Sequence, residues 1–228
     1  LAELEIPPPV SMPVLRHIIQ ETVRRNRLST GYVYLQVTRG VAPRDHAFPV
    51  DTKSALVVTA KRIDPEKTAR LIETGIQVIS VPDQRWGRRD IKSVSLLPNV
   101  LAKQAARAAG CYEAWQVEAG HVTEGASTNA WIVNEAGHLV THPADHSILN
   151  GITRQVLIEA ARQDGLHVDE RPFTLEEARA ASEAFSTSSS AILLPVIAID
   201  GKPIGTGRPG PVARRLHALY DAVAEFSS

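Results

Sequence analysis

Two hydrophobic periods alternate along this chain, and together they restrict the fold more than any other feature. Residues 12–26 carry apolar side chains on one stripe at helical spacing, whereas residues 32–37, 54–60 and 76–82 are short apolar bursts typical of strands. Helices and strands follow one another without the regular strand–helix–strand period of a doubly wound sheet. The sequence therefore predicts a mixed α/β (α+β) architecture.

Turn and capping residues indicate where further elements begin and end. A capping box of Thr174 and Glu177 opens a short helix. Helices are expected where apolar residues recur at helical spacing, and hairpins where Asn, Asp and Gly separate two strands. The predicted helices cover residues 97–110, 152–165 and 211–226, and the predicted hairpins turn at 134–137 and 200–201.

The chain length predicts two domains of unequal size. With 228 residues, one domain and a smaller companion are favoured. A short helix between Asp64-Pro65 and Gly75 marks the division, so we expect a smaller α/β amino-terminal domain over 1–66 and a larger one over 67–228. The chain opens without methionine, in what resembles the last turns of a helix before Pro7. We therefore expect the amino-terminal domain to be incomplete.

Composition excludes several classes of function. Lys and Arg balance Asp and Glu at 25 against 25, which argues against a nucleic-acid surface. The single cysteine, Cys111, allows no internal disulfide and suits a reducing compartment. No apolar run approaches the roughly 18 residues of a membrane helix. We expect a cytoplasmic protein whose partner is a small molecule or another protein, with no nucleic acid and no membrane.

Lys92 precedes a buriable apolar run in the segment DIKSVSLLPNV. Most lysines are exposed, and a surface lysine at a strand end is the ordinary interpretation. An amine held among apolar residues, however, loses its charge more readily and becomes a nucleophile able to form a Schiff base.

Three other segments carry groups that suit an anionic or cationic ligand. Glu124 precedes small residues that favour a turn, and a carboxylate presented at the edge of a pocket is an equal alternative. Gly151, Ile152 and Thr153 begin a predicted helix, whose free amides suit a phosphate, although every helix has such an end. The hydroxyls of residues 186–190 could join them, but a polar transition from strand to loop has the same composition.

The loop VTRGVAPRDHAFP gathers Arg39, Arg44 and His46. Paired cations suit a carboxylate, and a solvated loop with surface ion pairs is an equal alternative. His142 and His146 have the spacing of helical metal ligands, but a proline separates them, so we expect no metal site. No G-x-S-x-G motif supports serine hydrolysis.

Five of these segments, in this order and spacing, resemble the fold-type IV pyridoxal-phosphate aminotransferases, in particular members that act on D-amino acids. They are VYLQVTRGVAPRDHAFP, DIKSVSLLPNVLAKQAA, VTEGASTNAW, THPADHSILNGITR and the serine-rich strand. The resemblance covers nearly the whole chain. It implies a two-domain fold-type IV architecture in which residues 67–228 bind the cofactor.

The resemblance also implies roles for individual residues. Lys92 would bind pyridoxal 5′-phosphate as a Schiff base and then move the substrate proton, and Glu124 would pair with the pyridine nitrogen. The implied phosphate ligands are Gly151, Ile152, Thr153, Ser188 and Ser189, and Leu149 would back the cofactor ring.

The Arg44-x-His46 pattern would bind the substrate α-carboxylate in the neighbouring subunit of a homodimer. The implied activity is transamination between D-alanine or other D-amino acids and 2-oxo acids such as pyruvate or 2-oxoglutarate. Branched-chain aminotransferases, aminodeoxychorismate lyases and R-selective amine transaminases share the lysine and glutamate and remain alternatives. A non-catalytic remnant is an alternative of another class.

Overall fold

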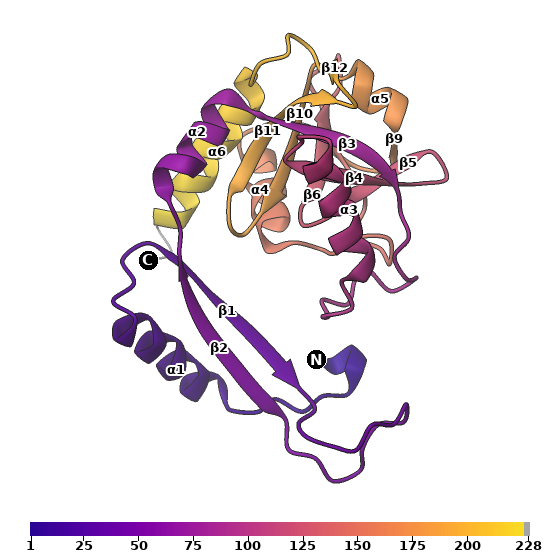
Figure 1. The fold of residues 1–228 in the computed structure, drawn as a ribbon. Helices are drawn as coiled ribbons and strands as arrows, with labels where there is room; N and C mark the ends of the chain where they lie inside the picture. The colour runs from indigo at the N-terminus through magenta and orange to yellow at the C-terminus, as the bar shows by residue number, and fades with distance from the viewer. Residues whose placement is uncertain (226–228) are drawn as a thin grey trace. The chain divides into compact units, whose positions relative to one another are not determined.

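The computed structural model describes residues 1–225, and its chain divides into two compact units, Leu1–Glu66 and Lys67–Ser228 (Figure 1). Phe226, which the sequence placed in the final helix, lies outside the described residues. No described helix is long and apolar enough to cross a membrane.

The first unit is a helix and a two-stranded antiparallel ribbon. Strand β1 (Gly31–Thr38) pairs with β2 (Ala55–Arg62) from Gly31↔Arg62 to Thr38↔Ala55. Side chains of β2 alternate between half-buried and exposed, as the period of a one-sided strand requires. The remaining elements are a 3₁₀ turn, η1 (Ala2–Leu4), and the helix α1 (Met12–Arg25). Only this single turn forms where the sequence suggested the end of a longer helix.

A mixed sheet forms the centre of the second unit. Within the described part of the chain its strands run in the order β8-β7-β6-β10-β11-β3-β4-β5-β9, and β12 pairs with β11. The pairs β11/β3, β3/β4 and β7/β8 are parallel, and the other pairs are antiparallel. The predicted mixed α/β architecture is thus confirmed. The strands are β3 (Ile76–Pro82), β4 (Glu113–Glu118), β5 (His121–Gly125), β6 (Asn129–Val133), β7 (Leu139–Thr141), β8 (Val168–Glu170), β9 (Phe173–Thr174), β10 (Glu183–Ser188), β11 (Ile192–Ile199) and β12 (Lys202–Pro203).

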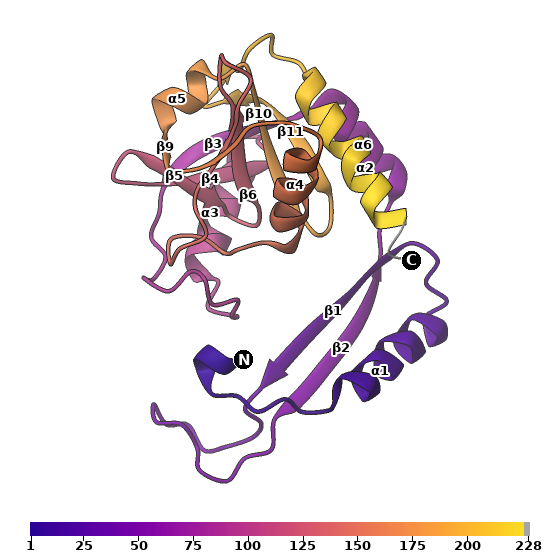
Figure 2. The same ribbon diagram turned by 180° about the vertical axis from the view of Figure 1, so that it is seen from behind.

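Helices cover this sheet and complete its core (Figures 1 and 2). One apolar cluster joins the sheet to α4 and α6, and it includes the stacked rings of Trp131 and Phe185, whose centroids lie 5.4 Å apart. Another contains the edge-to-face pair of Trp115 and Phe173. The helices are α2 (Pro65–Thr74), α3 (Leu97–Ala108), α4 (Ile152–Gln163), α5 (Leu175–Ala180) and α6 (Pro211–Glu225).

The predicted turns and caps are also confirmed. Thr174 and Glu177 form the capping box at the start of α5. Gly75 ends α2 at φ +76°, where a side chain would be strained. The hairpin between β11 and β12 turns through Asp200 and Gly201, both with positive φ, as a two-residue hairpin requires.

Candidate functional site

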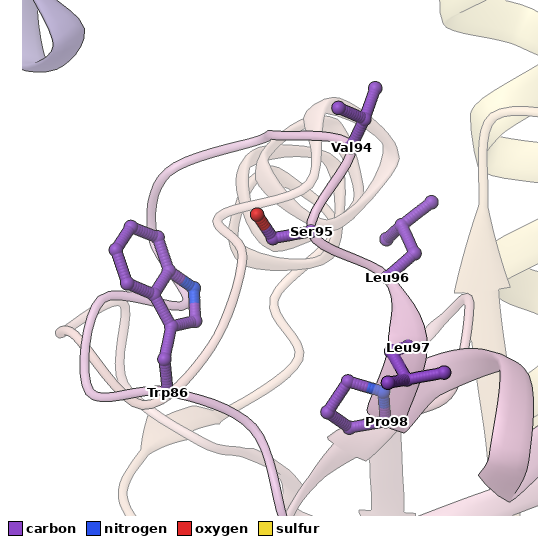
Figure 3. Close-up of a pocket in the computed structure, with 6 residues that line it drawn as sticks. All are labelled: Trp86, Val94, Ser95, Leu96, Leu97 and Pro98. Carbon is purple, nitrogen blue, oxygen red and sulfur yellow. The ribbon is translucent and has the colours of Figure 1, made fainter. Parts of the chain in front are cut away.

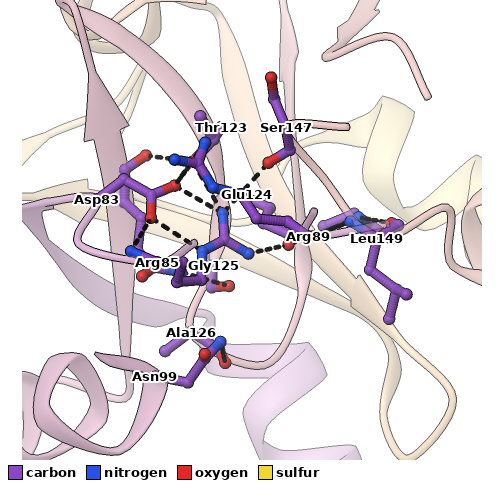
Figure 4. Close-up of polar contacts among 12 residues, drawn as sticks. Asp83, Arg85, Arg89, Asn99, Thr123, Glu124, Gly125, Ala126, Ser147 and Leu149 are labelled. Carbon is purple, nitrogen blue, oxygen red and sulfur yellow. Dashed lines mark hydrogen bonds and ion pairs between the residues drawn. The ribbon is translucent and has the colours of Figure 1, made fainter. Parts of the chain in front are cut away.

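Glu124 is a buried carboxylate on β5, only 5% exposed. Its two oxygens accept hydrogen bonds from Arg85 and, at 3.1 and 3.2 Å, from the backbone amide of Leu149 (Figure 4). They also accept one from Asn129 Nδ2 at 2.9 Å. The sequence suggested either a turn residue or a carboxylate at the edge of a pocket. The turn interpretation is wrong, because Glu124 lies on a strand and its carboxylate belongs to a polar network. A role of this carboxylate in a pocket stays a prediction.

Arg85 is shared between Glu124 and a second buried carboxylate, Asp83. Its guanidinium donates to Asp83 through Nε at 2.9 Å and Nη2 at 2.7 Å, and Nη1 contacts Glu124. Asp83 also accepts from Thr123 at 2.7 Å, and Arg89 lies 3.4 Å away. Asp83 therefore has more cationic and hydroxyl partners than Glu124, although both need them to offset burial.

Because their partners differ, Asp83 and Glu124 have pKa values shifted in opposite directions. Burial raises the pKa of Glu124 from 4.5 to about 7, against the opposing effect of Arg85. Burial also opposes ionisation of Asp83, but hydrogen bonds from Arg85 and Thr123 hold its pKa below the usual range. Of the two, Glu124 is the group that can change its protonation near neutral pH.

Arg85 was not identified by the sequence reasoning. The available signal was the spacing Asp83-x-Arg85 directly after the apolar strand β3, where a charged pair meets the carboxyl end of a buried strand. Arg85 is itself largely buried, with a side chain 6% exposed. Such a buried arginine with two carboxylate partners indicates a built network and not a solvated surface pair.

Asn129 joins the Glu124 network to the start of α4. Its Nδ2 donates to Glu124 and, at 2.7 Å, to the carbonyl oxygen of Leu149. Gly151 lies against the same amide, since a Cβ there would come within 2.4 Å of Asn129 Oδ1. The structure thus brings together Glu124, Leu149 and Gly151, three of the residues predicted to bind the cofactor.

The first turn of α4 and the end of β10 approach Asn129 from two sides. Gly151 is the N-cap of α4 and provides no side-chain cap, so the first amides, including those of Ile152 and Thr153, are available to an anion. On β10, Thr187 pairs with Asn129, and Ser188 follows it. Ser189 lies in the next turn and is exposed.

The hydroxyl run 186–190 divides into a structural and an accessible part. Ser186 accepts a hydrogen bond from Trp115 Nε1, and Thr187 accepts one from Trp131 Nε1, each at 3.0 Å. These two hydroxyls satisfy indole groups in the core. Ser188 is half-buried, so residues from 188 onward are the ones accessible to a ligand.

Lys92 lies in an irregular segment between β3 and α3 and is exposed. The prediction that Lys92 is buried among apolar residues is wrong for the single chain, because the apolar side chains that follow it are also exposed. Leu97, for example, is 70% exposed and Val94 is 66% exposed. Trp86 and residues 94–98 line a pocket beside this segment, as Figure 3 shows.

Of the three cations in the first loop, Arg39 has partners of its own. Arg39 donates to the carbonyl oxygens of Leu4 and Glu5 and lies 3.4 Å above the centre of the Phe48 ring. Arg39 therefore has a structural role. Arg44 and His46 are exposed in the loop 39–54.

The two histidines set aside as metal ligands have separate partners. His142 is buried, and its Nδ1 lies 3.0 Å from the carbonyl oxygen of Pro143. His146 is exposed and pairs through Nδ1 with Asp90 at 3.1 Å.

Comparison with known proteins identifies the class of protein to which the chain belongs. The family model "Amino-transferase class IV" matches residues 1–199, and the chain belongs to this family.

Within the family, the chain is 40% identical over 220 residues to the D-alanine aminotransferase of Listeria monocytogenes, covering 96% of this chain and 76% of that relative. The branched-chain amino acid aminotransferase of Escherichia coli superposes with a TM-score of 0.86 at 26% identity, covering 97% of this chain and 74% of that one. An aminotransferase from Brucella abortus bound to the cofactor PLP superposes with a TM-score of 0.83, covering 97% and 79%. Its identity to this chain is 23%, so that likeness is one of fold alone.

Proposed function

We propose that this chain is a pyridoxal-phosphate-dependent transaminase that exchanges an amino group between D-alanine or other D-amino acids and 2-oxo acids such as pyruvate and 2-oxoglutarate. The observation that carries the proposal is the buried carboxylate of Glu124, in a chain 40% identical to a D-alanine aminotransferase. The single cysteine supports a cytoplasmic location as part of the same proposal.

The donor set fits pyridoxal 5′-phosphate, which when bound supplies a ring that withdraws electrons from the substrate Cα. Glu124 would accept the hydrogen of the pyridine nitrogen, and its pKa of about 7 suits a shared proton there. The phosphate would take the amides of Ile152 and Thr153, with the hydroxyls of Ser188 and Ser189. These groups offer a carboxylate to a cation and amides to an anion, as the cofactor requires.

Two further residues complete the proposed cofactor site. Leu149 would back the ring, since its backbone amide already binds Glu124. Lys92 would hold the cofactor through its amine, and the same amine would carry the proton removed from the substrate Cα. The exposed position of Lys92 leaves its amine accessible to the aldehyde.

We also propose a homodimer in which Arg44 and His46 bind the substrate α-carboxylate in the pocket of the neighbouring subunit. Both side chains are exposed in a loop that the rest of their own unit leaves uncovered. Arginine offers a two-pronged donor that matches a carboxylate, and this loop would set the handedness of the substrate.

An exposed apolar surface supports the dimer. Helix α3 packs Ala102 and Ala106 against the sheet, yet its other face and the segment before it expose large apolar side chains. Monomeric proteins rarely leave such a continuous patch uncovered. We define it as the α3 patch; it consists of Trp86, Val94, Leu96, Leu97, Val100 and Leu101.

Sedimentation velocity tests this arrangement. Leu97→Asp should convert a dimer to a monomer, because it places a charge within the α3 patch. Gln104→Asp, at an exposed polar position of the same helix, should stay dimeric. A Leu97→Asp protein that sediments like the parent would contradict the proposed interface.

The visible absorption spectrum of the chain with pyridoxal phosphate tests the function. We expect a band from the lysine-bound cofactor that D-alanine bleaches and L-alanine does not. Lys92→Ala should lose the band and transaminase turnover, whereas Lys202→Ala, which removes an exposed lysine elsewhere, should keep both.

Other results of these assays would favour one of the alternative functions. Bleaching by L-alanine would favour an L-specific relative, which branched L-amino acids would then identify. Turnover of aminodeoxychorismate or of a simple R-amine would favour the lyase or the amine transaminase. A folded chain that stays colourless with the cofactor would refute the proposal and favour a non-catalytic protein.

A further inference from the structure

An edge of the sheet in the second unit brings two histidines and an aspartate together. Strands β7 and β8 pair in parallel with Leu139 opposite Val168. His138 precedes β7, and the amide of Leu139 donates to the carbonyl oxygen of His167 at 2.9 Å. His167 and Asp169 flank Val168, which packs against the core. Because side chains alternate along a strand, His167 and Asp169 share the outward face, beside His138.

The side chains of this cluster lie at distances suited to a metal ion. His167 Nε2 lies 2.7 Å from Asp169 Oδ1, and His138 Nδ1 lies 3.9 Å from Asp169 Oδ2. The two imidazole ring centres are 4.2 Å apart. One ligand atom from each of the three residues lies within 4.8 Å of the others. Ligands around one Zn²⁺, each about 2.0–2.2 Å from it, lie roughly 3–4 Å apart, so small side-chain rotations would close the site.

Asp169 pairs with the two histidines, whereas the nearby arginines pair with another carboxylate. The neighbouring carboxylate, Glu170, points to the other face of β8 and pairs with Arg154 at 2.8 Å and Arg162 at 3.1 Å. The ion pairs described for Asp169 are with His138 and His167. Asp169 is therefore the carboxylate that offsets the charge of a cation at this edge.

Backbone constraints hold the three residues in place. The amide of His138 donates to the side-chain oxygen of Asn134 at 2.9 Å, which fixes the turn between β6 and β7. His167 and Asp169 are held by the pairing of β7 with β8. Ligands on paired strands are more rigid than ligands on a free loop, which lowers the ordering cost of binding an ion.

We propose that His138, His167 and Asp169 form a site for a divalent transition-metal ion, with Zn²⁺ as the best match. Two imidazoles and one carboxylate are a donor set that zinc accepts, and three protein ligands leave a position for water or an external group. None of the three is a residue proposed to bind the cofactor or the substrate. A bound ion would link β7 to β8 and fasten the edge strand to the sheet.

Isothermal titration of the untagged chain with ZnCl₂ tests the site. We expect one ion per chain and a higher melting temperature, since an ion that binds the folded state stabilises it. His138→Gln and His167→Gln should each weaken binding at least tenfold. His17→Gln, which removes an exposed histidine on α1, should bind like the parent.

Titration with Co²⁺ gives a second measurement that does not depend on the melting temperature. The visible cobalt spectrum reports its ligands, and we expect Asp169→Asn to change it. Failure of the parent to bind Zn²⁺, or equal binding by the parent and both histidine variants, would overturn the proposal. Circular dichroism of the variants shows that they are folded. The assays need no cofactor and no turnover, so they are independent of the proposed transaminase function.

Discussion

Replacing Glu124 by glutamine should remove a pH-dependent contribution to stability. The folded-state pKa of Glu124 is about 7, against 4.5 ordinarily, so the folded chain binds this proton more tightly than the unfolded chain. The stabilisation from that proton is fully present below pH 4.5 and is lost as pH rises through 7. Between pH 5 and pH 8 the loss is about 2–3 kcal/mol, from 1.36 kcal/mol for each pKa unit.

Glutamine keeps the shape of the side chain and cannot ionise, so the variant lacks this loss. The stability of the parent relative to Glu124→Gln should therefore fall by about 2–3 kcal/mol from pH 5 to pH 8. Urea denaturation of the cofactor-free chain, followed by the fluorescence of the buried Trp115 and Trp131, measures it. Glu135→Gln, in an exposed turn, is the control for loss of one carboxylate.

A difference in stability between parent and Glu124→Gln that stays constant from pH 5 to pH 8 would contradict the raised pKa of Glu124. A constant difference would mean that Arg85 keeps Glu124 ionised throughout, despite its burial. The cofactor-bound chain offers a further check, because a cation at Glu124 should lower the pKa of its carboxyl group and shift the transition to lower pH.

Substitutions at three other positions test the polar contacts of the second unit by urea denaturation. Arg85→Met should lower the free energy of unfolding by about 3–5 kcal/mol at pH 8, because Asp83 and Glu124 lose their shared cation, and by less at pH 5. An equal decrease at both pH values would contradict the shared network. Glu183→Ala should lower the free energy of unfolding by about 1–2 kcal/mol, since Glu183 accepts hydrogen bonds from two backbone amides at the start of α6, each at 2.9 Å. Glu183→Gln should recover part of this stability. Thr174→Ala should cost about 1 kcal/mol by opening the capping box of α5, and an unchanged midpoint would remove that role.

The sequence predicted most elements because their signals are local. The helical stripe of α1 and the capping box of Thr174 and Glu177 act within a few residues of the chain. The hairpin at Asp200 and Gly201 depends on backbone conformations that those residues favour. The absence of a regular strand–helix period also predicted the mixed sheet.

The Lys92 segment shows where local patterns fail. Its neighbours Val94 and Leu97 are apolar, which led us to expect burial, yet both are exposed in the single chain. An apolar run indicates that a surface needs to be covered. It does not say whether the same chain or a partner covers it, because hydrophobic burial has no direction.

By itself, the sequence determined the local elements, the family motifs and the residue types offered to a cofactor. Only the tertiary structure decided that Arg85 is shared by Asp83 and Glu124, and that His138 lies beside His167. These contacts join residues on or next to strands, and the sequence of each segment alone does not specify how those strands pair. Pairing depends on how the whole sheet is ordered, and burial and charge at each site follow from that order.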